Sequence, residues 1–571
     1  MQNTFLPTSA KEVAALGWDS LDVILFTGDA YIDHPAFGAA VIGRTLQAAG
    51  YRVAIVPQPD WRGDWRDFKK LGVPRLFFGV TAGAMDSTVN HYTPTLRLRS
   101  DDAYTPDNRA GARPDYPTIV YTKILKELYP STPVVLGGIE ASLRRLTHYD
   151  YLQDRLRPSF LVESGADLLI YGMGEKAIVD VARALENRLP TEDIPQTVRF
   201  THTPPANIQA MHSYEECVAN SKKFAANFVA IETASNMASA PVLVEPYKDG
   251  AMVVNPPYPT FTTEDCDATY DLPYMRSPAP RYRGKTIAAW EMIKFSINSH
   301  RGCYGGCSFC AISMHQGKFI ASRSKKSIVS EVEKVSGMED FRGTITDVGG
   351  PSANMWQTGG RKKDICAKCR RASCLFPKIC VNLNNDHAPI LELYKAVGAV
   401  RGVKHTFVGS GIRYDMFDKT DYFETVIVHH TSGRFKVAPE HTEDAVLALM
   451  RKPSFTLFEK MRVDFDRICA KNNLRYELIP YFISAHPGCG EQQMRALKTK
   501  THGVMTNQVQ DFTPTPMTLS SVMFYTGQDP YTGQKLYVAR DKASKDKQKS
   551  YFFDHCAPTN RSQNNKWQKK Q

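Results

Sequence analysis

The sequence lacks the features that mark membrane and secreted proteins. No window of its 571 residues approaches 18 uninterrupted apolar residues, the length that a membrane-spanning helix needs. Residues 1–20 contain no basic flank followed by an apolar stretch and a small-residue cleavage site, so they do not resemble a secretory signal. We therefore expect a cytoplasmic protein that makes no contact with a membrane.

Cysteine is too scarce for a disulfide-stabilised fold, since the chain has only 12. Most of them lie in two short segments, and in a reducing compartment clustered cysteines more often bind metal or take part in catalysis. We expect the isolated cysteines to be small buried apolar residues: Cys217, Cys266, Cys469, Cys489 and Cys556.

The composition excludes a largely disordered chain. Hydrophobic residues make up 42% and charged residues 23%, as in ordinary soluble globular proteins. The length exceeds what one hydrophobic core usually serves, so we expect two to four domains.

Basic residues outnumber acidic ones, giving a net charge of +12. Nine Lys or Arg and three Asp lie between Arg540 and Gln571, so six of the twelve surplus charges belong to this end. We expect residues 538–571 to form a basic, disordered tail that keeps the protein soluble. Contact with RNA remains an alternative role for the tail.

Short apolar runs alternate with amphipathic helical stretches from Asp22 to Arg188. Examples are the runs DVILFTG and RVAIVPQP, with the helical stretch FGAAVIGRTLQAAG between them. This alternation predicts an α/β domain over residues 1–188 with a doubly wound parallel sheet. Glycines at 137–138 and 172–174 fall just past strand ends, where such sheets bind ligands and where tight turns also occur.

Residues 189–286 are rich in proline and irregular, as in NPPYPTF and RSPAPRYRG. The stretch PVLVEPYKDGAMVVN predicts one hairpin, since Asp-Gly suits a tight turn. We expect a structural connector that packs on the first domain.

A second alternation begins at Ile287 and continues to about Tyr537. Six strand-helix units, with chemically distinctive residues at the strand ends, predict a full or partial barrel that is active at its C-terminal rim. The second domain is therefore assigned to residues 287–537.

Three cysteines stand within eight residues, in the spacing Cys303-x3-Cys307-x2-Cys310. Gly305 and Gly306 between them allow a tight loop with all three sulfurs pointing inward. Structural zinc and ordinary electron-transfer clusters use four protein ligands. Three thiolates suit a cubane cluster whose fourth iron stays open for a substrate or cofactor.

This loop, with Phe309 before its last cysteine and a barrel strand before it, resembles the signature of radical S-adenosylmethionine (SAM) enzymes. The strings LGGIEASLRRLTHYDY, SHRGCYGGCSFCAI, KVAPEHTEDAVLALMRKP and YFISAHPG are similar to those of the YgiQ-type radical SAM family, over residues 18–537. The resemblance implies a 4Fe-4S cluster on Cys303, Cys307 and Cys310, and a radical SAM partial (β/α)6 barrel. It also implies that SAM binds the open iron and is cleaved to a 5′-deoxyadenosyl radical.

The resemblance assigns further cofactor-binding residues at the strand ends. Phe309 is expected beside the adenine, and Gly349 and Gly350 at the methionyl end of SAM. Pro351 stands where the family has a glutamate. Arg413 and Glu440 follow later strands, where relatives contact the ribose and carboxylate of SAM. Reduced flavodoxin or ferredoxin is the expected electron donor.

The N-terminal domain resembles the cobalamin-binding domain of one branch of these enzymes. The DxHxxG sequence that some cobalamin proteins use is not met, because His34 directly follows Asp33. We therefore expect a sheet without a cofactor, with His34 in a turn or at the surface, although some relatives bind cobalamin without the motif.

A second cysteine group lies in an insertion at residues 361–385. Its spacing, Cys366-x2-Cys369-x4-Cys374-x5-Cys380, indicates a second metal site. An auxiliary iron-sulfur cluster, a structural zinc ion and metal-free thiols are the alternatives, of which the cluster is favoured.

These features predict a radical SAM enzyme that abstracts hydrogen from an unidentified substrate. Two alternatives stay open: an RNA-modifying member of the same superfamily, and a non-enzymatic iron-sulfur or zinc sensor.

Overall fold

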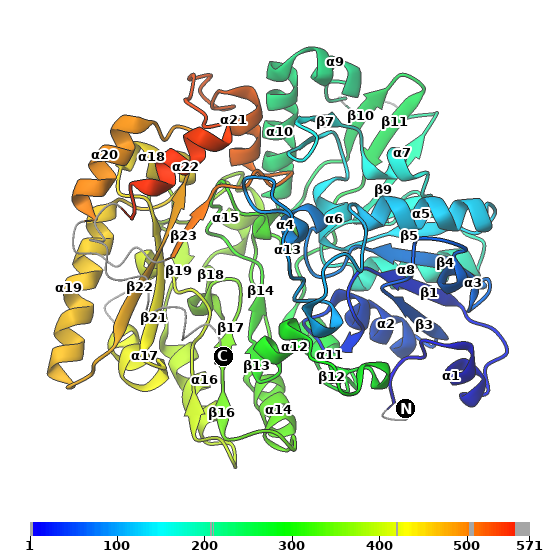
Figure 1. The fold of residues 1–571 in the computed structure, drawn as a ribbon, viewed down its shortest axis with the longest axis horizontal. Coiled ribbons are helices and arrows are strands. Elements are labelled where there is room, and N and C mark those ends of the chain that lie inside the picture. Colours follow the sequence, from blue (N-terminus) through cyan, green and yellow to red (C-terminus); the bar gives the residue numbers. More distant parts are fainter. Residues whose placement is uncertain (1–3, 206–207, 209, 418–420, 502–507, 554–571) are drawn as a thin grey trace.

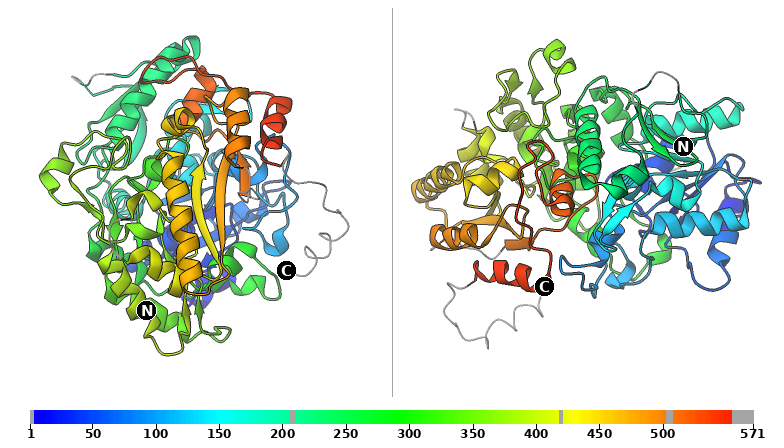
Figure 2. Two further views of the ribbon diagram at one scale, coloured as in Figure 1. Left: turned by 90° about the vertical axis from the view of Figure 1, so that its left-hand side faces the viewer. Right: turned by 90° about the horizontal axis from the view of Figure 1, so that it is seen from above.

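The computed structural model describes residues 4–205, 208, 210–417, 421–501 and 508–553. An N-terminal sheet domain and a C-terminal barrel lie side by side, with residues from the middle of the chain between them (Figures 1 and 2). Among the described residues, no helix is long and apolar enough to cross a membrane.

The N-terminal domain contains an eight-stranded sheet in the order β10-β11-β9-β8-β5-β4-β1-β3. Five neighbouring strands are parallel: β3 (Val53–Pro57), β1 (Val23–Thr27), β4 (Phe77–Thr81), β5 (Val134–Leu136) and β8 (Leu168–Ile170). After β3 the chain crosses to the other side of β1, so the switch point of the sheet lies between β1 and β4. The predicted doubly wound parallel sheet is confirmed.

Helices cover both faces of this sheet because successive strand residues point to opposite sides. Val23 and Leu25 pack under α2 (Gly38–Ala48) and α8 (Glu175–Glu186). Ile24 and Phe26 belong to the opposite core, under α5 (Pro117–Leu128) and α7 (Phe160–Ser164). Shorter elements of this half are α1 (Ala10–Ala15), β2 (Ile32–Asp33), α3 (Arg66–Lys69), α4 (Ser87–His91), α6 (Gly138–Leu143), β6 (His148–Asp150) and β7 (Arg155–Arg157).

Residues 189–286 differ from the predicted connector, because they complete the sheet. The expected hairpin is present as β10 (Leu243–Tyr247) and β11 (Gly250–Val254), and β9 (Thr197–Thr201) joins it to β8 by antiparallel pairing. Other elements here are α9 (Tyr214–Ala219), α10 (Ser221–Ser235), α11 (Thr263–Tyr270) and β12 (Ser277–Pro278), and α12 (Ala288–Ile293) follows this segment. The segment therefore belongs to the N-terminal core.

The C-terminal half is a partial barrel of short parallel strands. The ladders pair β13 (Ser296–Asn298) with β17 (Asp347–Gly349), β16 (Thr344–Ile345) with β20 (His405–Thr406), and β21 (Arg434–Glu440) with β22 (Glu477–Ser484) and β23 (Gln508–Asp511). In the described residues no ladder joins β20 to β21. The surrounding helices are α14 (Lys325–Ser336), α16 (Ala388–Gly398), α17 (Tyr422–His430), α18 (Asp444–Met450), α19 (Phe455–Lys471), α20 (Glu491–Lys500) and α21 (Leu519–Thr526). These are the six strand-helix units that the sequence predicts.

The expected disordered tail needs correction over its first part. Residues Lys542–Ser550 form α22, which lies across the top of the barrel (Figure 1). The Gln548 side chain accepts from the Ala485 amide at 2.9 Å and donates to the Cys489 carbonyl at 2.7 Å. Lys545, 1% exposed, donates to the Pro94 carbonyl of the N-terminal domain. Hydrogen bonds hold this polar helix, and residues 554–571 lie outside the described residues.

Glu245 on β10 provides a test of whether β9, β10 and β11 extend the buried sheet. Its side chain is fully buried, accepts from the Thr147 amide, and burial raises its pKa to about 7. The folded state therefore favours the protonated acid. The contribution of Glu245 to the free energy of unfolding is fully present at pH 4 and is lost as the pH rises to 7. We predict that Glu245→Gln increases the free energy of unfolding by up to about 3 kcal/mol at pH 8.

The gain should shrink towards pH 4, as measured by calorimetry. The exposed Glu127→Gln serves as the control and should show no such dependence. An equal gain at both pH values would contradict the assignment.

Candidate active site

The three-cysteine loop lies between β14 (His300–Arg301) and α13 (Ile312–Gln316), directly after the first barrel strand. Backbone hydrogen bonds attach it to separate parts of the barrel. The Cys303 amide donates to the Gly317 carbonyl, and the Ser308 amide donates to the Met450 carbonyl. The loop is therefore held at both ends independently of any bound group.

The three thiols are each partly buried. Burial and the neighbouring Cys307 raise the pKa of Cys310 to about 12, and the same causes raise the pKa of Cys303. Thiols in this setting become thiolates only when a positive group compensates them, which a cluster iron does.

Among the described residues, no three acidic, histidine or cysteine side chains converge around one point as the ligands of a single ion do. A cubane cluster does not need that convergence, because each cysteine binds a different iron.

Arg413 reaches the cysteine loop from the start of a short 3-10 turn, Tyr414–Met416. Its Nη1 donates to Cys307 Sγ at 3.1 Å, and its Nη2 lies 2.5 Å from the Asp415 carboxylate. The sequence singles out Arg413 but not Asp415. In the structure Arg413 pairs with the Asp415 carboxylate, whereas the sequence predicts that it pairs with a carboxylate of the ligand. Contact of Arg413 with SAM stays a prediction.

Gly349 ends β17, and Gly350 follows it. Atoms of other residues lie close to both glycines. A Cβ atom at Gly350 would lie 2.5 Å from the His300 ring, and one at Gly349 would lie 2.6 Å from Ser410 Oγ. The Gly349 carbonyl accepts from the Ser299 amide at 2.7 Å, so this strand end is fixed to the strand that precedes the cysteines. His300, which the sequence does not single out, is 1% exposed, and its Nε2 has no partner.

Glu440 and Phe309 lie at the same rim. Glu440 ends β21 with a left-handed φ of 69°, and its carboxylate lies 3.6 Å from Lys452 Nζ, while burial raises its pKa. The Phe309 ring packs edge-on against His486. Their assigned contacts with SAM stay predictions.

A hydrogen-bonded chain behind the loop also escapes sequence analysis. His486 Nε2 lies 2.7 Å from Ser520 Oγ, which donates to Ser308 Oγ at 2.8 Å. All three side chains are buried. The chain connects the end of β22 to the cysteine loop through residues distant in sequence.

The second cysteine group packs directly on the first. The Cys374 amide donates to the Tyr304 carbonyl at 3.0 Å, and Ser373 Oγ donates to the Gly305 carbonyl at 2.7 Å. The insertion also contains α15 (Lys363–Ala367), flanked by β18 (Gly359–Gly360) and β19 (Leu383–Asn384). It thus covers one side of the Cys303 loop.

The four thiols of this insertion are near one another. Burial raises the pKa of Cys374 to about 11, Lys318 opposes the rise, and the other three thiols of the group add to it. Lys318 Nζ lies 3.6 Å from Cys369 Sγ. The four thiols do not converge as the ligands of a single ion do, and their identity as metal ligands stays a prediction.

A cavity of about 410 Å³ lies between the two domains. One wall is formed by the carboxyl ends of the parallel strands and the first turn of α2, including Thr81, Gly138 and Ala39. The barrel contributes His300 and Pro351. The cavity therefore occupies the edge of the sheet where doubly wound domains bind ligands.

Gly306 tests whether the insertion positions the cysteine loop. Its φ is +60°, and a Cβ atom would lie 2.2 Å from the Ala372 carbonyl oxygen, so Gly306→Ala must move the insertion or the loop. We predict that iron bound after reconstitution falls by more than half, as measured by elemental analysis.

Gly411→Ala is the control, because nothing lies within 4 Å of a Cβ atom there and its φ is ordinary. Full iron loading in Gly306→Ala would show that the loop tolerates displacement of the insertion.

Comparison with known proteins relates the whole chain to one group. The family model for the N-terminal domain of radical SAM proteins matches residues 5–296, and a domain of unknown function, DUF3362, matches residues 507–561. A UPF0313 protein of Bacteroides thetaiotaomicron is 55% identical, covering 96% of this chain and 94% of the relative. UPF0313 proteins of Porphyromonas gingivalis and Geobacter sulfurreducens are 54% and 45% identical, over 96% and 98% of this chain and 90% and 93% of theirs.

The fold is similar to that of a solved enzyme. The radical SAM methyltransferase TsrM from Kitasatospora setae, with cobalamin and a [4Fe-4S] cluster bound, superposes with a TM-score of 0.53 at 15% identity. The match covers 95% of this chain and 92% of TsrM. The likeness therefore extends over both domains, at a level that shows the fold alone.

Proposed function

Because the chain belongs to the UPF0313 (YgiQ-type) family of radical SAM proteins, we propose that it is an enzyme that cleaves SAM reductively on a [4Fe-4S] cluster. Cys303, Cys307 and Cys310 would hold the cluster. The observation that carries this proposal is their common loop, which lies at the C-terminal rim of the barrel and is fixed by its own backbone hydrogen bonds. When bound, cluster and SAM supply a 5′-deoxyadenosyl radical that abstracts hydrogen from a substrate.

The rim residues would position SAM beside the cluster. Gly349 and Gly350 would present their backbone to the methionyl end of SAM, while Ser410 and His300 fill the space that side chains would take at these positions. Pro351 supplies no carboxylate, so backbone oxygens would hold the SAM ammonium. Phe309 would lie beside the adenine, while Arg413 and Glu440 would orient the remaining polar groups of SAM.

The second cysteine group would bind an auxiliary iron-sulfur cluster, with structural zinc as the alternative. Its support is the direct hydrogen bond between Cys374 and Tyr304, the residue that follows Cys303. An auxiliary cluster there would be close enough to pass electrons from reduced flavodoxin or ferredoxin. The low potentials that such clusters reach suit that role.

A cobalamin-dependent methyltransferase is the second candidate, and the interdomain cavity favours it. The cavity adjoins the switch point of the sheet and extends to the barrel rim. His34 lies in a turn, is 3% exposed and does not line the cavity, so it would not bind cobalt.

Two further alternatives give separate signatures. An RNA-modifying enzyme would copurify with RNA that is released as the salt concentration rises. A non-enzymatic sensor would hold its cluster without consuming SAM.

Anaerobic incubation of the reconstituted protein with dithionite and SAM tests the main proposal. We predict that 5′-deoxyadenosine forms, as read by mass spectrometry, and that Cys307→Ala abolishes it because the cluster loses one of its three ligands. Cys469→Ala, which alters an isolated buried thiol, should retain it. No nucleoside from a fully loaded protein would move the sensor alternative to the front.

Cobalamin binding can be measured independently of SAM cleavage. If the second candidate is right, hydroxocobalamin should remain with the protein through gel filtration at about one per chain, as read from its visible spectrum. Ala39→Trp fills part of the cavity and should lower retention at least tenfold, whereas Ala49→Trp at the other end of the same helix should not. Equal loss or equal retention in both variants would argue against this site.

A further inference from the structure

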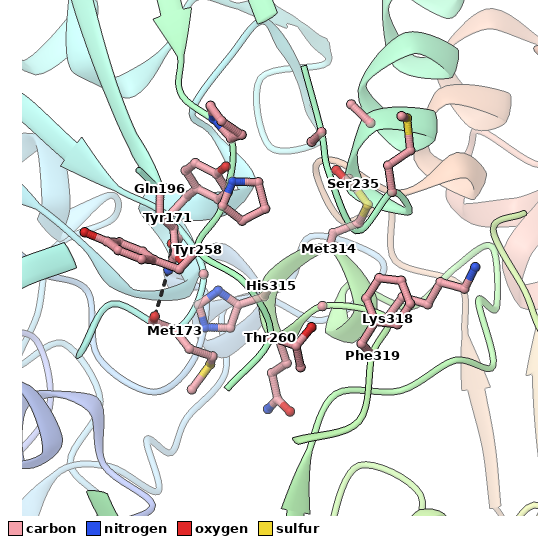
Figure 3. Close-up of a pocket in the computed structure, with 18 of the residues that line it drawn as sticks. Tyr171, Met173, Gln196, Ser235, Tyr258, Thr260, Met314, His315, Lys318 and Phe319 are labelled. Carbon is pink, nitrogen blue, oxygen red and sulfur yellow. Dashed lines mark hydrogen bonds between the residues drawn. The ribbon is translucent and has the colours of Figure 1, made fainter. Parts of the chain in front are cut away.

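A second cavity, of about 140 Å³, adjoins the interdomain cavity. Figure 3 shows Tyr171, Met173 and Gln196 of the N-terminal domain on one side, Lys318 and Phe319 on the other, and His315 between them. Five residues line both cavities: Gly172, Met173, Arg301, His315 and Gln316. The two cavities therefore adjoin each other.

Arg145 lines this second cavity and is 3% exposed. Its Nη1 donates to the Ser142 carbonyl at 2.7 Å, its guanidinium lies 4.8 Å from the centre of the Tyr171 ring, and its Nε has no partner. No carboxylate among the described residues forms an ion pair with it. Burial without such a partner lowers its pKa.

Every other buried arginine in the described part of the chain does pair with a carboxylate: Arg44, Arg113, Arg144, Arg157, Arg276, Arg301, Arg323 and Arg413. This regularity has a physical reason, because a buried charge without a counter-charge is costly. Arg145 is the exception, and it lines this cavity.

The lining as a whole favours an anion. The charged residues around the cavity are Arg145, Arg301 and Lys318, and its described lining contains no aspartate or glutamate. Glu175 pairs with Arg301, and Lys318 donates to Cys369 Sγ and the Arg371 carbonyl, so Arg145 is the arginine of this lining whose charge no described carboxylate neutralises. The neighbouring His315 adds no positive charge near neutral pH, since burial lowers its pKa to about 4 and leaves the ring neutral.

We propose that Arg145 binds an anionic group, a carboxylate or a phosphate, of the substrate. The guanidinium provides a planar fork that suits both groups. The remainder of the ligand would extend past His315 into the interdomain cavity, towards the cysteine loop. This inference rests on the proposed function only in taking the ligand to be the substrate.

Arg145→Met removes the charge and keeps most of the volume. With full-length reconstituted protein, we predict that inorganic phosphate or succinate raises the melting temperature at constant ionic strength, and that Arg145→Met weakens this response at least tenfold. A response to phosphate alone indicates a phosphate ligand, and a response to succinate alone indicates a carboxylate. Arg155→Met, which removes an exposed charge outside both cavities, should respond like the parent.

Without added anion, Arg145→Met should melt at the same temperature as the parent or higher, because an unpaired buried charge has been removed. If the arginine is instead structural, the variant melts several degrees lower and neither anion stabilises the parent, which would overturn the proposal. Should Arg145→Met fail to fold, Arg145→Lys provides the second test: it keeps the charge, loses the fork and should bind phosphate more weakly than the parent. An unchanged response in Arg145→Lys would also overturn it.

Anion binding is read without SAM cleavage, so the two proposals fail separately. Loss of the Arg145-dependent response leaves radical chemistry intact, and absence of 5′-deoxyadenosine leaves the anion site intact.

Discussion

The ion pair between Arg301 and Glu175 joins the two domains, between the cysteine loop and the edge of the N-terminal sheet. Arg301 lies two residues before Cys303, the first cysteine of the loop, and Glu175 begins α8 at the edge of the sheet. Both are buried, and the Tyr270 hydroxyl accepts a further hydrogen bond from Arg301 at 3.2 Å. Removing either partner would leave a buried charge, which costs several kcal/mol, on the order of 3–5. The positions of the cysteine loop and of both cavities depend on this pair.

The cysteine loop depends further on the insertion that carries the second cysteine group. Gly306 approaches Ala372 so closely that only glycine fits, and Ser373 binds the Gly305 carbonyl. A metal bound by the insertion would therefore stiffen the Cys303 loop, which is proposed to bind the first cluster. This explains in physical terms why two cysteine groups distant in sequence lie in one structural unit.

Local patterns were sufficient for most of the fold. Buried apolar runs such as VILFT and VAIVP identified the parallel strands, and the doubly wound sheet and partial barrel followed from their alternation with helices. The role of residues 189–286 could not be predicted, because the pairing of β9 with β8 and β11 is a choice among distant partners. The helix at Lys542–Ser550 escaped for another reason: Lys545 and Gln548 are buried through hydrogen bonds, which leave no apolar periodicity.

The amino-acid sequence by itself determined the class of chemistry, since the spacing of Cys303, Cys307 and Cys310 within one loop is local information. It also indicated the second cysteine group and the glycines at the end of β17. Only the tertiary structure separated Arg144 from Arg145, two identical neighbours. Arg144 pairs with Asp86, 58 residues away, while Arg145 faces a cavity without a carboxylate. Whether a charge is neutralised depends on which side chains folding brings beside it, and the sequence alone does not give these neighbours.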